Sequence, residues 1–255
     1  MKTYEICIQS LCSMVIFMAT ITGCKEKQTA KDPARRIVFE AIQAIGGLEQ
    51  ATGWSTRVQK GLYMTNQPGW GHLTANTSRF VSKPDKAKID NDFSAYDHPF
   101  YFTYYLNGDD AWQVANLSVR QSPQLTERMK EYLEKADGLA YFLVNCDTLF
   151  LVGEVSGDSL LPGLSMNRVG CSSGEDTIFF DFDGKNHLLV REIESKEAKH
   201  TIYGDYRKTG DILAPYHVTV YRNGEKSEEY VWQVIKFNEE IDPAIFEEDR
   251  PGVEE

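Results

Sequence analysis

Residues 101–112 read YFTYYLNGDDAW, and this stretch indicates most directly how the chain folds. Two apolar, aromatic-rich runs flank Asn107-Gly108, and Asn-Gly is the pair that the tight turn of a two-residue β-hairpin favours. Large aromatic side chains are also enriched in strands. The stretch therefore predicts an antiparallel hairpin, with one strand over 101–106 and the other over 111–116.

The segments around this hairpin repeat its pattern. Apolar and polar side chains alternate over 58–65, which is typical of a half-buried strand. Further strands are predicted near 70–81, from 84 onward, and at 178–182, 187–193, 201–207, 215–222 and 229–237. Short turns such as Asp183-Gly184 and Asn223-Gly224 separate neighbours, and strands do not alternate with helices. We therefore predict a mainly β (α+β) single domain with an antiparallel sheet.

Two helices are predicted among these strands. Asp32 and Pro33 are a favourable N-cap and first residue, an apolar stripe follows, and Gly46-Gly47 ends the helix, so we predict it over 33–45. Ser122-Pro123 opens a second helix with apolar side chains at helical spacing up to Ala136. Residues 139–144 form an apolar segment of undecided structure, and the Gly-, Ser-, Asp- and Pro-rich region 145–174 has no clear assignment.

Composition excludes several classes of protein. The chain has 255 residues, a formal net charge of −11 and 42% hydrophobic residues, as expected of a folded globular protein. The acidic balance argues against a nucleic-acid partner, because phosphate binding requires a basic face. The mean hydropathy of −0.41 excludes a polytopic membrane protein.

The N-terminus has the features of an export signal. Residues 6–23 carry no charge, and Ile21-Thr22-Gly23-Cys24 resembles the lipobox of bacterial lipoproteins. We therefore expect a signal peptide over 1–23, lipidation of Cys24 after cleavage, a tether over 24–31 and a folded domain over 32–255. Two or three acyl chains give a stable membrane anchor. An ordinary secretory signal and an uncleaved membrane helix are the alternatives. The expected location is the cell envelope, facing the periplasm, with the outer membrane favoured.

The remaining polar motifs do not predict catalysis. Cys146 and Cys171 can form a disulfide in an oxidising compartment or stay as two buried thiols. Residues 170–174 fit the pattern G-x-S-x-G, but a strand rather than a helix follows, contrary to a nucleophile elbow. Residues 181–186 faintly resemble a calcium loop, which a hairpin turn explains equally well. We predict no catalytic residue, no metal, no cofactor and no enzyme activity.

Aromatic side chains are the more informative feature. Several strands carry large apolar groups on both faces, as in Tyr101 with Phe102, Phe179 with Phe180, and Val231 with Trp232. A sheet with one solvated face would alternate more cleanly, so the second face is either packed against helices or lines a cavity. The candidate cavity residues are Trp54, Leu62, Phe80, Phe102, Tyr104, Trp112, Phe180, Val218 and Trp232.

The order of these elements resembles the outer-membrane lipoprotein-sorting superfamily, the LolA/LolB-like proteins, over most of residues 33–251. The matching segments are AIGG at 44–47, VQKGLY at 58–63, NGDDAW at 107–112, FDFD at 180–183, LL at 188–189, APYHV at 214–218, NG at 223–224, FN at 237–238, IDPAIF at 241–246 and Pro251. The region 145–174 does not follow the family pattern.

This resemblance implies a strongly curved, unclosed antiparallel β-barrel with helices covering its open side. Family members bind acyl chains or other hydrophobic ligands in the concave space. The expected function is therefore a lipid-anchored periplasmic protein that binds an acyl chain or the lipid of a lipoprotein, with a role in lipid or lipoprotein trafficking. The alternative is a non-catalytic envelope interaction or structural lipoprotein. No functional residue of the family transfers to this chain.

Overall fold

The structure, a computed structural model, describes residues 32–67, 71–96, 99–116 and 118–249. Within these ranges, no helix is both long enough and apolar enough to cross a membrane. The expected signal peptide over 1–23, the lipidation site Cys24 and the tether over 24–31 lie outside the described residues. These three expectations therefore stay predictions.

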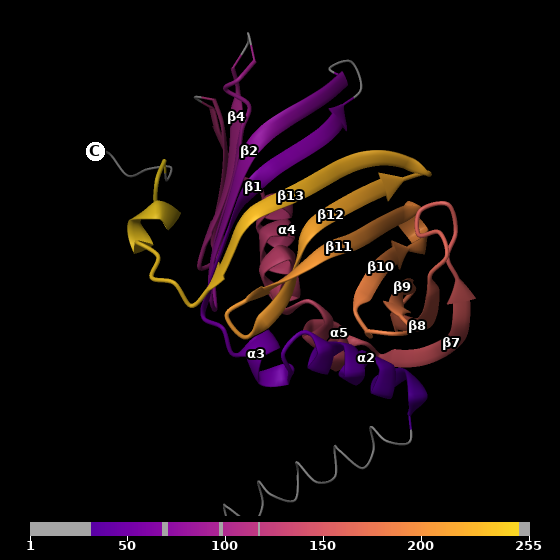
Figure 1. Ribbon diagram of the computed structural model, residues 1–255. Helices are drawn as coiled ribbons and strands as arrows, with labels where there is room; N and C mark the ends of the chain where they lie inside the picture. Colours follow the sequence, from indigo (N-terminus) through magenta and orange to yellow (C-terminus); the bar gives the residue numbers. More distant parts are fainter. Residues whose placement is uncertain (1–31, 68–70, 97–98, 117, 250–255) are drawn as a thin grey trace, which may run out of the picture.

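The described strands form one antiparallel sheet, as predicted, and it is not closed into a barrel (Figure 1). Its strand order is β6-β5-β4-β3-β2-β1-β13-β12-β11-β10-β9-β8-β7. The strands of the first half are β1 Thr56–Gln67, β2 Gly71–Ser82, β3 Lys86–Asp92, β4 Tyr101–Asn107, β5 Asp110–Ala115 and β6 Ser118–Arg120. Those of the second half are β7 Thr148–Ser156, β8 Ser165–Ser173, β9 Asp176–Asp183, β10 Leu189–Glu194, β11 Lys199–Thr209, β12 Ile212–Arg222 and β13 Glu225–Phe237.

This order consists of two meanders, β1–β6 and β7–β13, joined where the first strand pairs with the last. Leu62 of β1 lies opposite Val231 of β13, although they are far apart in sequence. The chain must therefore travel from one edge of the sheet at β6 to the other edge at β7. It does so through α4, η1 and α5, which lie within the curve of the sheet (Figure 1). The topology thus places helices on the concave face.

The N-terminal helix forms as its capping residues predict. In α2, Pro33–Ala44, the Asp32 carboxylate accepts hydrogen bonds from the backbone N–H of Ala34 at 3.0 Å and of Arg35 at 3.2 Å. Gly46 ends it with a φ of +124°, and a Cβ there would lie 2.4 Å from the carbonyl oxygen of Asp211. The short helix α3, Leu48–Thr52, follows. The predicted span of 33–45 is correct to within one residue.

The connector between the two meanders contains one expected helix and one that the sequence left undecided. The second predicted helix is α4, Pro123–Glu134, capped by the Ser122 hydroxyl at 3.1 Å from the N–H of Leu125. After η1, Lys135–Asp137, the apolar segment forms α5, Leu139–Asn145. Gly138 separates the two with a φ of +59°. A short apolar run does not by itself distinguish a helix from a buried strand.

The region 145–174 is also ordered, as the hairpin β7–β8. Its strand pattern is obscured by a register shift between Leu151 and Gly153, where Gly153 has a φ of +124°. Phe150 lies over Gly170 on the neighbouring strand, so that a Cβ at Gly170 would be 2.2 Å from the ring. These glycines lower the strand signal of the sequence, although each has a defined place in the sheet.

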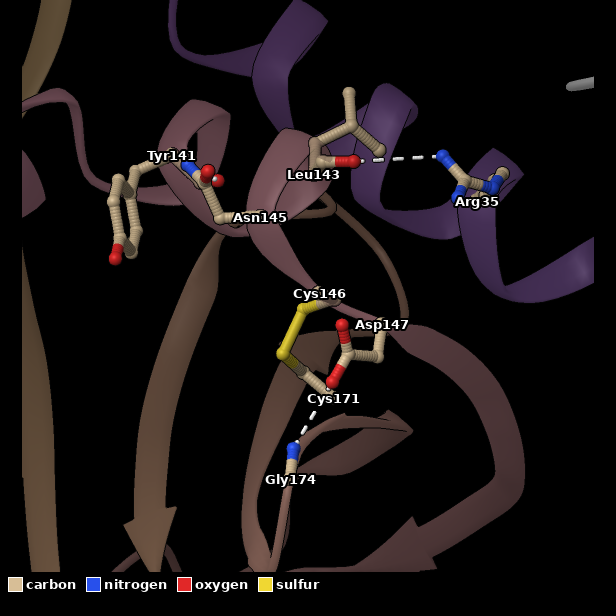
Figure 2. Close-up of a disulfide and its surroundings, with 8 residues drawn as sticks. All are labelled: Arg35, Tyr141, Leu143, Asn145, Cys146, Asp147, Cys171 and Gly174. Carbon is tan, nitrogen blue, oxygen red and sulfur yellow. Dashed lines mark hydrogen bonds between the residues drawn. A yellow bond between two sulfur atoms is a disulfide. The ribbon is translucent and has the colours of Figure 1, made fainter.

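A disulfide between Cys146 and Cys171 ties α5 to β8 (Figure 2). Its Cα atoms are 5.6 Å apart, within the usual range, and both residues are buried in the same apolar cluster. Beside it, the Asp147 carboxylate accepts a hydrogen bond from the N–H of Gly174 at 3.0 Å, and Arg35 of α2 donates to the carbonyl of Leu143 at 3.4 Å. Two helices and two strands are thereby joined at this point.

The apolar core is divided between the two ends of the sheet. At one end, α4 packs through Met129 and Leu133 on residues of β2–β5. At the other, α2 and α5 pack on β7–β9, including Phe180 and Phe182. The central strands have only a thin cluster that includes Trp232. The helices thus cover both ends of the concave face and leave space over its middle.

Candidate functional site

A cavity of about 550 Å³ lies over the central strands, on the concave face. Its floor consists of residues from β1, β2 and β10–β13, and its roof is the connector from Tyr132 to Phe142. This volume is within the range of about 300–1,000 Å³ that is typical of small-molecule sites. The cavity therefore follows from the topology, because the connector spans the concave face above strands that no helix fills.

One end of the cavity is apolar and aromatic. Trp54 packs edge-on against Phe237 at 5.9 Å, and Tyr230 stacks on Trp232 at 5.7 Å. The other apolar lining residues are Ile45, Ala51, Ala136, Leu139, Phe142, Ile212, Leu213, Ala214, Pro215, Val218, Val220 and Ile235. Burial of a ligand's apolar surface against these side chains is favourable by about 25 cal/mol per Å².

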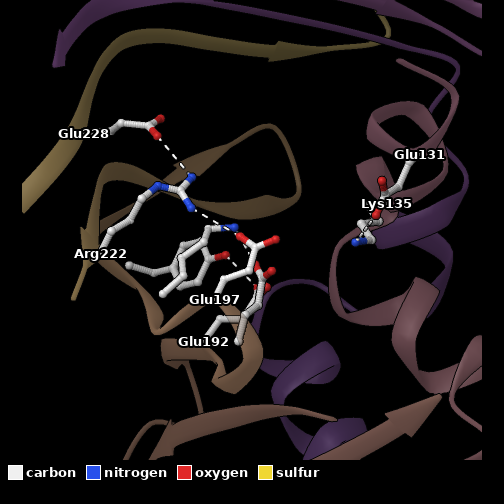
Figure 3. A network of polar contacts seen from close by, with 9 residues as sticks. Glu131, Lys135, Glu192, Glu197, Arg222 and Glu228 are labelled. Carbon is white, nitrogen blue, oxygen red and sulfur yellow. Dashed lines mark hydrogen bonds and ion pairs between the residues drawn. The ribbon is translucent and has the colours of Figure 1, made fainter. Parts of the chain in front are cut away.

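The other end is charged (Figure 3). Arg222 pairs with Glu228 at 3.4 Å and with Glu197 at 3.2 Å. Lys199 pairs with Glu194, and the strand register brings these two residues opposite each other. Most charges at this end thus have a partner within the protein. The cavity is amphipathic: Arg222, Glu228, Lys199 and Glu194 lie at one end of strands β10–β13, and Trp232 and Phe237 lie towards the other end.

Glu192 lies at the charged end with an altered acidity. Its carboxylate accepts a hydrogen bond from the Tyr203 hydroxyl at 3.0 Å. Burial, and then repulsion by Glu194, raise the pKa of Glu192 above its usual range, and the Tyr203 hydrogen bond only partly opposes this. The same burial raises the pKa of Tyr203. The folded chain therefore binds the Glu192 proton more tightly than the unfolded chain does.

Two cations hold the roof to the floor. Arg57 of β1 donates to the carbonyl oxygen of Ala136 at 3.0 Å. Lys83 pairs with Asp137, and its ammonium lies 3.8 Å from the centre of the Trp54 ring. These contacts hold η1, the turn between α4 and α5, over the apolar end of the cavity.

A second cavity of about 400 Å³ lies beneath α4. It is lined by Leu125 and Met129 of the helix and by aromatic residues of β3 and β4, including Phe102 and Tyr104. Both cavities are lined by Arg79, Tyr132, Tyr230 and Glu228, so these four residues form the wall between the two spaces.

Arg79 is the central residue of this wall and is surrounded by aromatic rings. Its guanidinium carbon lies 4.4 Å from the ring centre of Tyr230, 5.1 Å from that of Trp232 and 5.9 Å from that of Tyr132. The Nε atom is buried and has no hydrogen-bond acceptor among the described residues. The hydroxyl of Tyr132 and the Nε of Arg57 are buried and unpartnered in the same way. Three unused donors therefore line the first cavity.

Five of the nine predicted cavity residues line one of the two spaces. Trp54, Val218 and Trp232 line the first cavity. Phe102 and Tyr104 line the second. Four of these five side chains are aromatic, and their role in binding a ligand stays a prediction.

The other four predicted residues line neither of these two cavities. Phe180 is covered by Phe142 of α5, whose ring centre lies 4.9 Å away, and it belongs to the apolar core. Leu62 and Phe80 have the strand parity of Val58, opposite to that of Arg57 and Arg79, and therefore face away from the cavity. Trp112 lies opposite Tyr105 on the neighbouring strand and stacks on it, with ring centres 4.9 Å apart. The C-terminal segment covers Trp112, and the carbonyl oxygen of Glu248 accepts a hydrogen bond from the indole N–H at 3.3 Å.

The apolar second face thus has several explanations. At Trp112, residues near η3, Pro243–Phe246, cover the outer face of the sheet (Figure 1). At Phe179, the ring packs edge-on against Phe150 at 6.2 Å. Tyr101 is 38% exposed. Among the described residues, the inner face of the central strands borders the first cavity, and residues of β3 and β4 border the second.

The two polar motifs have structural roles. Ser172 lies in β8, between Thr148 and Thr177 of the neighbouring strands, and no helix follows it. Asp181 is fully buried and accepts from Arg168 at 2.6 Å and from Arg191 at 2.7 Å, so its oxygens are occupied. Within the described ranges, no group of three or more His, Cys, Asp or Glu side chains could hold a metal ion.

The sequence matches no protein-family model and no curated protein. Its fold, however, is similar to those of several solved structures. A DUF1329 family protein from Desulfovibrio piger has a TM-score of 0.56 at 15% identity, covering 85% of this chain and 98% of that one. A domain from Vibrio parahaemolyticus, named as a putative outer membrane lipoprotein-sorting protein domain, has a TM-score of 0.54 at 12% identity. The match covers 84% of this chain and 97% of that one. A LolA superfamily protein from Nitrosomonas europaea has a TM-score of 0.53 at 10% identity, and the match covers 84% of this chain and 96% of that one.

These similarities bear on the fold. The open, curved sheet and the helices within its curve are those that the resemblance to LolA/LolB-like proteins implies. At this level of identity the match does not transfer a ligand or a functional residue.

Proposed function

We propose that this chain is a lipid-anchored protein of the bacterial cell envelope that binds a hydrophobic ligand without catalysis. The cavity over the central strands is the observation that carries the proposal: about 550 Å³, with an aromatic end that includes Trp54 and Trp232. An acyl chain of a lipid or lipoprotein fits such a lining chemically, and trafficking of that ligand is the associated role.

The anchor rests on the sequence around Cys24. Ile21-Thr22-Gly23-Cys24 resembles a lipobox, and a net charge of −11 disfavours adsorption to anionic lipid surfaces. Metabolic labelling of cells with an alkyne-bearing fatty acid tests this directly. We expect label on the wild-type chain and none on Cys24→Ala. Equal labelling of both would refute the anchor.

Native mass spectrometry of the full chain carrying Cys24→Ser tests the ligand cavity, since this substitution removes the proposed anchor and keeps every described residue. We expect co-purified lipid, or uptake of an added apolar dye. The matched pair is Val218→Trp, which fills the cavity, and Leu62→Trp, which adds the same ring on the opposite face. Loss of uptake only in Val218→Trp supports the proposal, whereas no uptake by any form refutes it.

An envelope interaction module is the second candidate, and one surface favours it. Phe150, Leu151 and Val152 of the edge strand β7 are 37%, 41% and 49% exposed. Edge strands with apolar side chains readily pair with other chains. Cross-linking in cells through a photoreactive residue at Val152, with one defined protein captured and no lipid bound to the purified chain, would favour this function over the first.

A further inference from the structure

We propose that the ligand is an anionic amphiphile, and that Arg79 and Tyr132 bind its carboxylate or phosphate group on the wall between the two cavities. This inference rests on the proposed binding function and specifies its ligand class. Its basis is the pair of unused donors, the Nε of Arg79 and the hydroxyl of Tyr132, both buried and both lining the two cavities.

A guanidinium remains protonated in proteins, so Arg79 places a permanent positive charge on the wall. The nearest acid on that wall, Glu228, already pairs with Arg222 at 3.4 Å and accepts from the Tyr230 hydroxyl at 2.9 Å. Arg79 forms no ion pair with any residue that the structure describes. Burial lowers the pKa of Arg79, but its neighbours Tyr132, Tyr230 and Glu228 outweigh this effect and raise it. Because none of them forms a direct ion pair with the guanidinium, a bound anion would be its first direct counter-ion.

An unsatisfied buried donor is costly, and here three occur in one cavity, on Arg57, Arg79 and Tyr132. Water can satisfy a donor but does not balance the guanidinium charge. A carboxylate or phosphate accepts several hydrogen bonds and supplies the negative charge, and arginine is well suited to bind both.

Val81 lies opposite Arg57 and Arg79 lies opposite Gln59, so the two arginines occupy diagonal positions on the same face of β1 and β2. Tyr230 and Trp232 stack around Arg79 and limit its rotation. The first cavity extends from this wall to the aromatic end at Trp54. An anionic head at Arg79 therefore leaves the attached chain on apolar side chains.

The test compares probes that share one chain and differ in the head. Affinities of hexadecanoate, hexadecyl phosphate and hexadecanol are measured by dye displacement from the full chain carrying Cys24→Ser. We expect the two anions to bind about 10- to 100-fold more tightly than the alcohol, as hydrogen bonds to charged groups imply. In Arg79→Met this preference should fall close to one while the alcohol still binds. Tyr132→Phe should lose several-fold of the preference.

Lys60→Met is the matched control, because it removes a cation from β1 on the face that carries Phe80, outside the cavity. It should keep the full preference. Thermal unfolding of each variant reports whether it folds. If Arg79→Met does not fold, Arg79→Lys and Tyr132→Phe decide the matter. Lysine keeps the charge but lacks the Nε donor and the planar guanidinium, so Arg79→Lys, like Tyr132→Phe, should lose several-fold of the preference.

Each outcome has one meaning. Equal binding of acid and alcohol by the wild type, or an unchanged preference in the Arg79 and Tyr132 variants, overturns this inference and leaves the proposed binding function intact. No binding of any long-chain probe overturns both. Displacement of the probe by acetate or inorganic phosphate at the same concentrations as hexadecanoate indicates a site for free anions, and overturns the assignment to an amphiphile.

Discussion

Loss of the Cys146–Cys171 disulfide should lower the free energy of unfolding by about 3.5 kcal/mol. The two cysteines are separated by 25 residues in sequence. A loop of that length restricts the unfolded chain by about 12 cal/mol/K in the chain-entropy relation, which gives about 3.5 kcal/mol at 25 °C. Small domains have only about 5–15 kcal/mol in total, so the effect is large. Because α5 carries Leu139 and Phe142 of the cavity roof, ligand binding should also weaken.

Urea unfolding of the wild type and of the double variant Cys146→Ala/Cys171→Ala measures this difference. The midpoint should fall, and the m-value should rise, because the unfolded state without a cross-link exposes more surface. Wild-type protein with and without a reducing agent is the control for the side-chain changes. The variant, which has neither thiol, should not respond to the reducing agent.

Two results would refute this reasoning. Alkylation of unfolded, unreduced Cys24→Ser protein, followed by peptide mass mapping that finds Cys146 and Cys171 both alkylated, would show that the bond does not form. A decrease in unfolding free energy below about 1 kcal/mol, with the bond present, would show that the chain-entropy relation does not apply here.

Three further outcomes are expected. Gly61→Ala should lower the unfolding free energy by about 1–3 kcal/mol in urea titrations, because its Cβ would lie 2.2 Å from the carbonyl oxygen of Val231; an unchanged midpoint would contradict the tight register shift. Glu192→Gln should raise the Tm at pH 8 and not at pH 4. The pKa of Glu192 in the folded state is raised above about 4.5, so the stability of the wild type falls as the pH rises through this pKa. A lower Tm for the variant than for the wild type at pH 8 would contradict this reasoning. Val218→Trp should reduce the stoichiometry of lipid uptake while Leu62→Trp should not, and equal uptake would place the ligand outside the cavity.

Much of the local structure could be predicted because it depends on near neighbours. Asn107-Gly108 forms the turn of the β4–β5 hairpin, and Asp32 and Pro33 form the start of α2. Both depend on contacts within a few residues. The structure of segment 139–144 was not predicted, because a short apolar run fits either a helix or a buried strand. The hairpin β7–β8 was not predicted, because Gly153 interrupts the alternation of its first strand.

The candidate site was only partly predictable. Aromatic residues in strands indicated a cavity, but in strands that are apolar on both faces, alternation does not say which face is concave. Trp232 and Leu62 therefore received the same assignment, although only Trp232 lines the cavity. Arg79 and Tyr132 received none, because an arginine in a strand and a tyrosine in a helix look like ordinary surface residues in a sequence.

The sequence by itself determined an acidic, mainly antiparallel chain, its two longest helices and most of its turns, because each depends on local backbone preferences and on periodicity. The tertiary structure alone decided that β1 pairs with β13, that the connector crosses the concave face, and that a cavity remains between the helix-covered ends. These features depend on contacts between residues far apart in the chain, whose closure entropy is repaid only when the whole sheet assembles. Burial of the Arg79 Nε atom without a hydrogen-bond acceptor among the described residues is such a feature, since it arises where three distant segments meet.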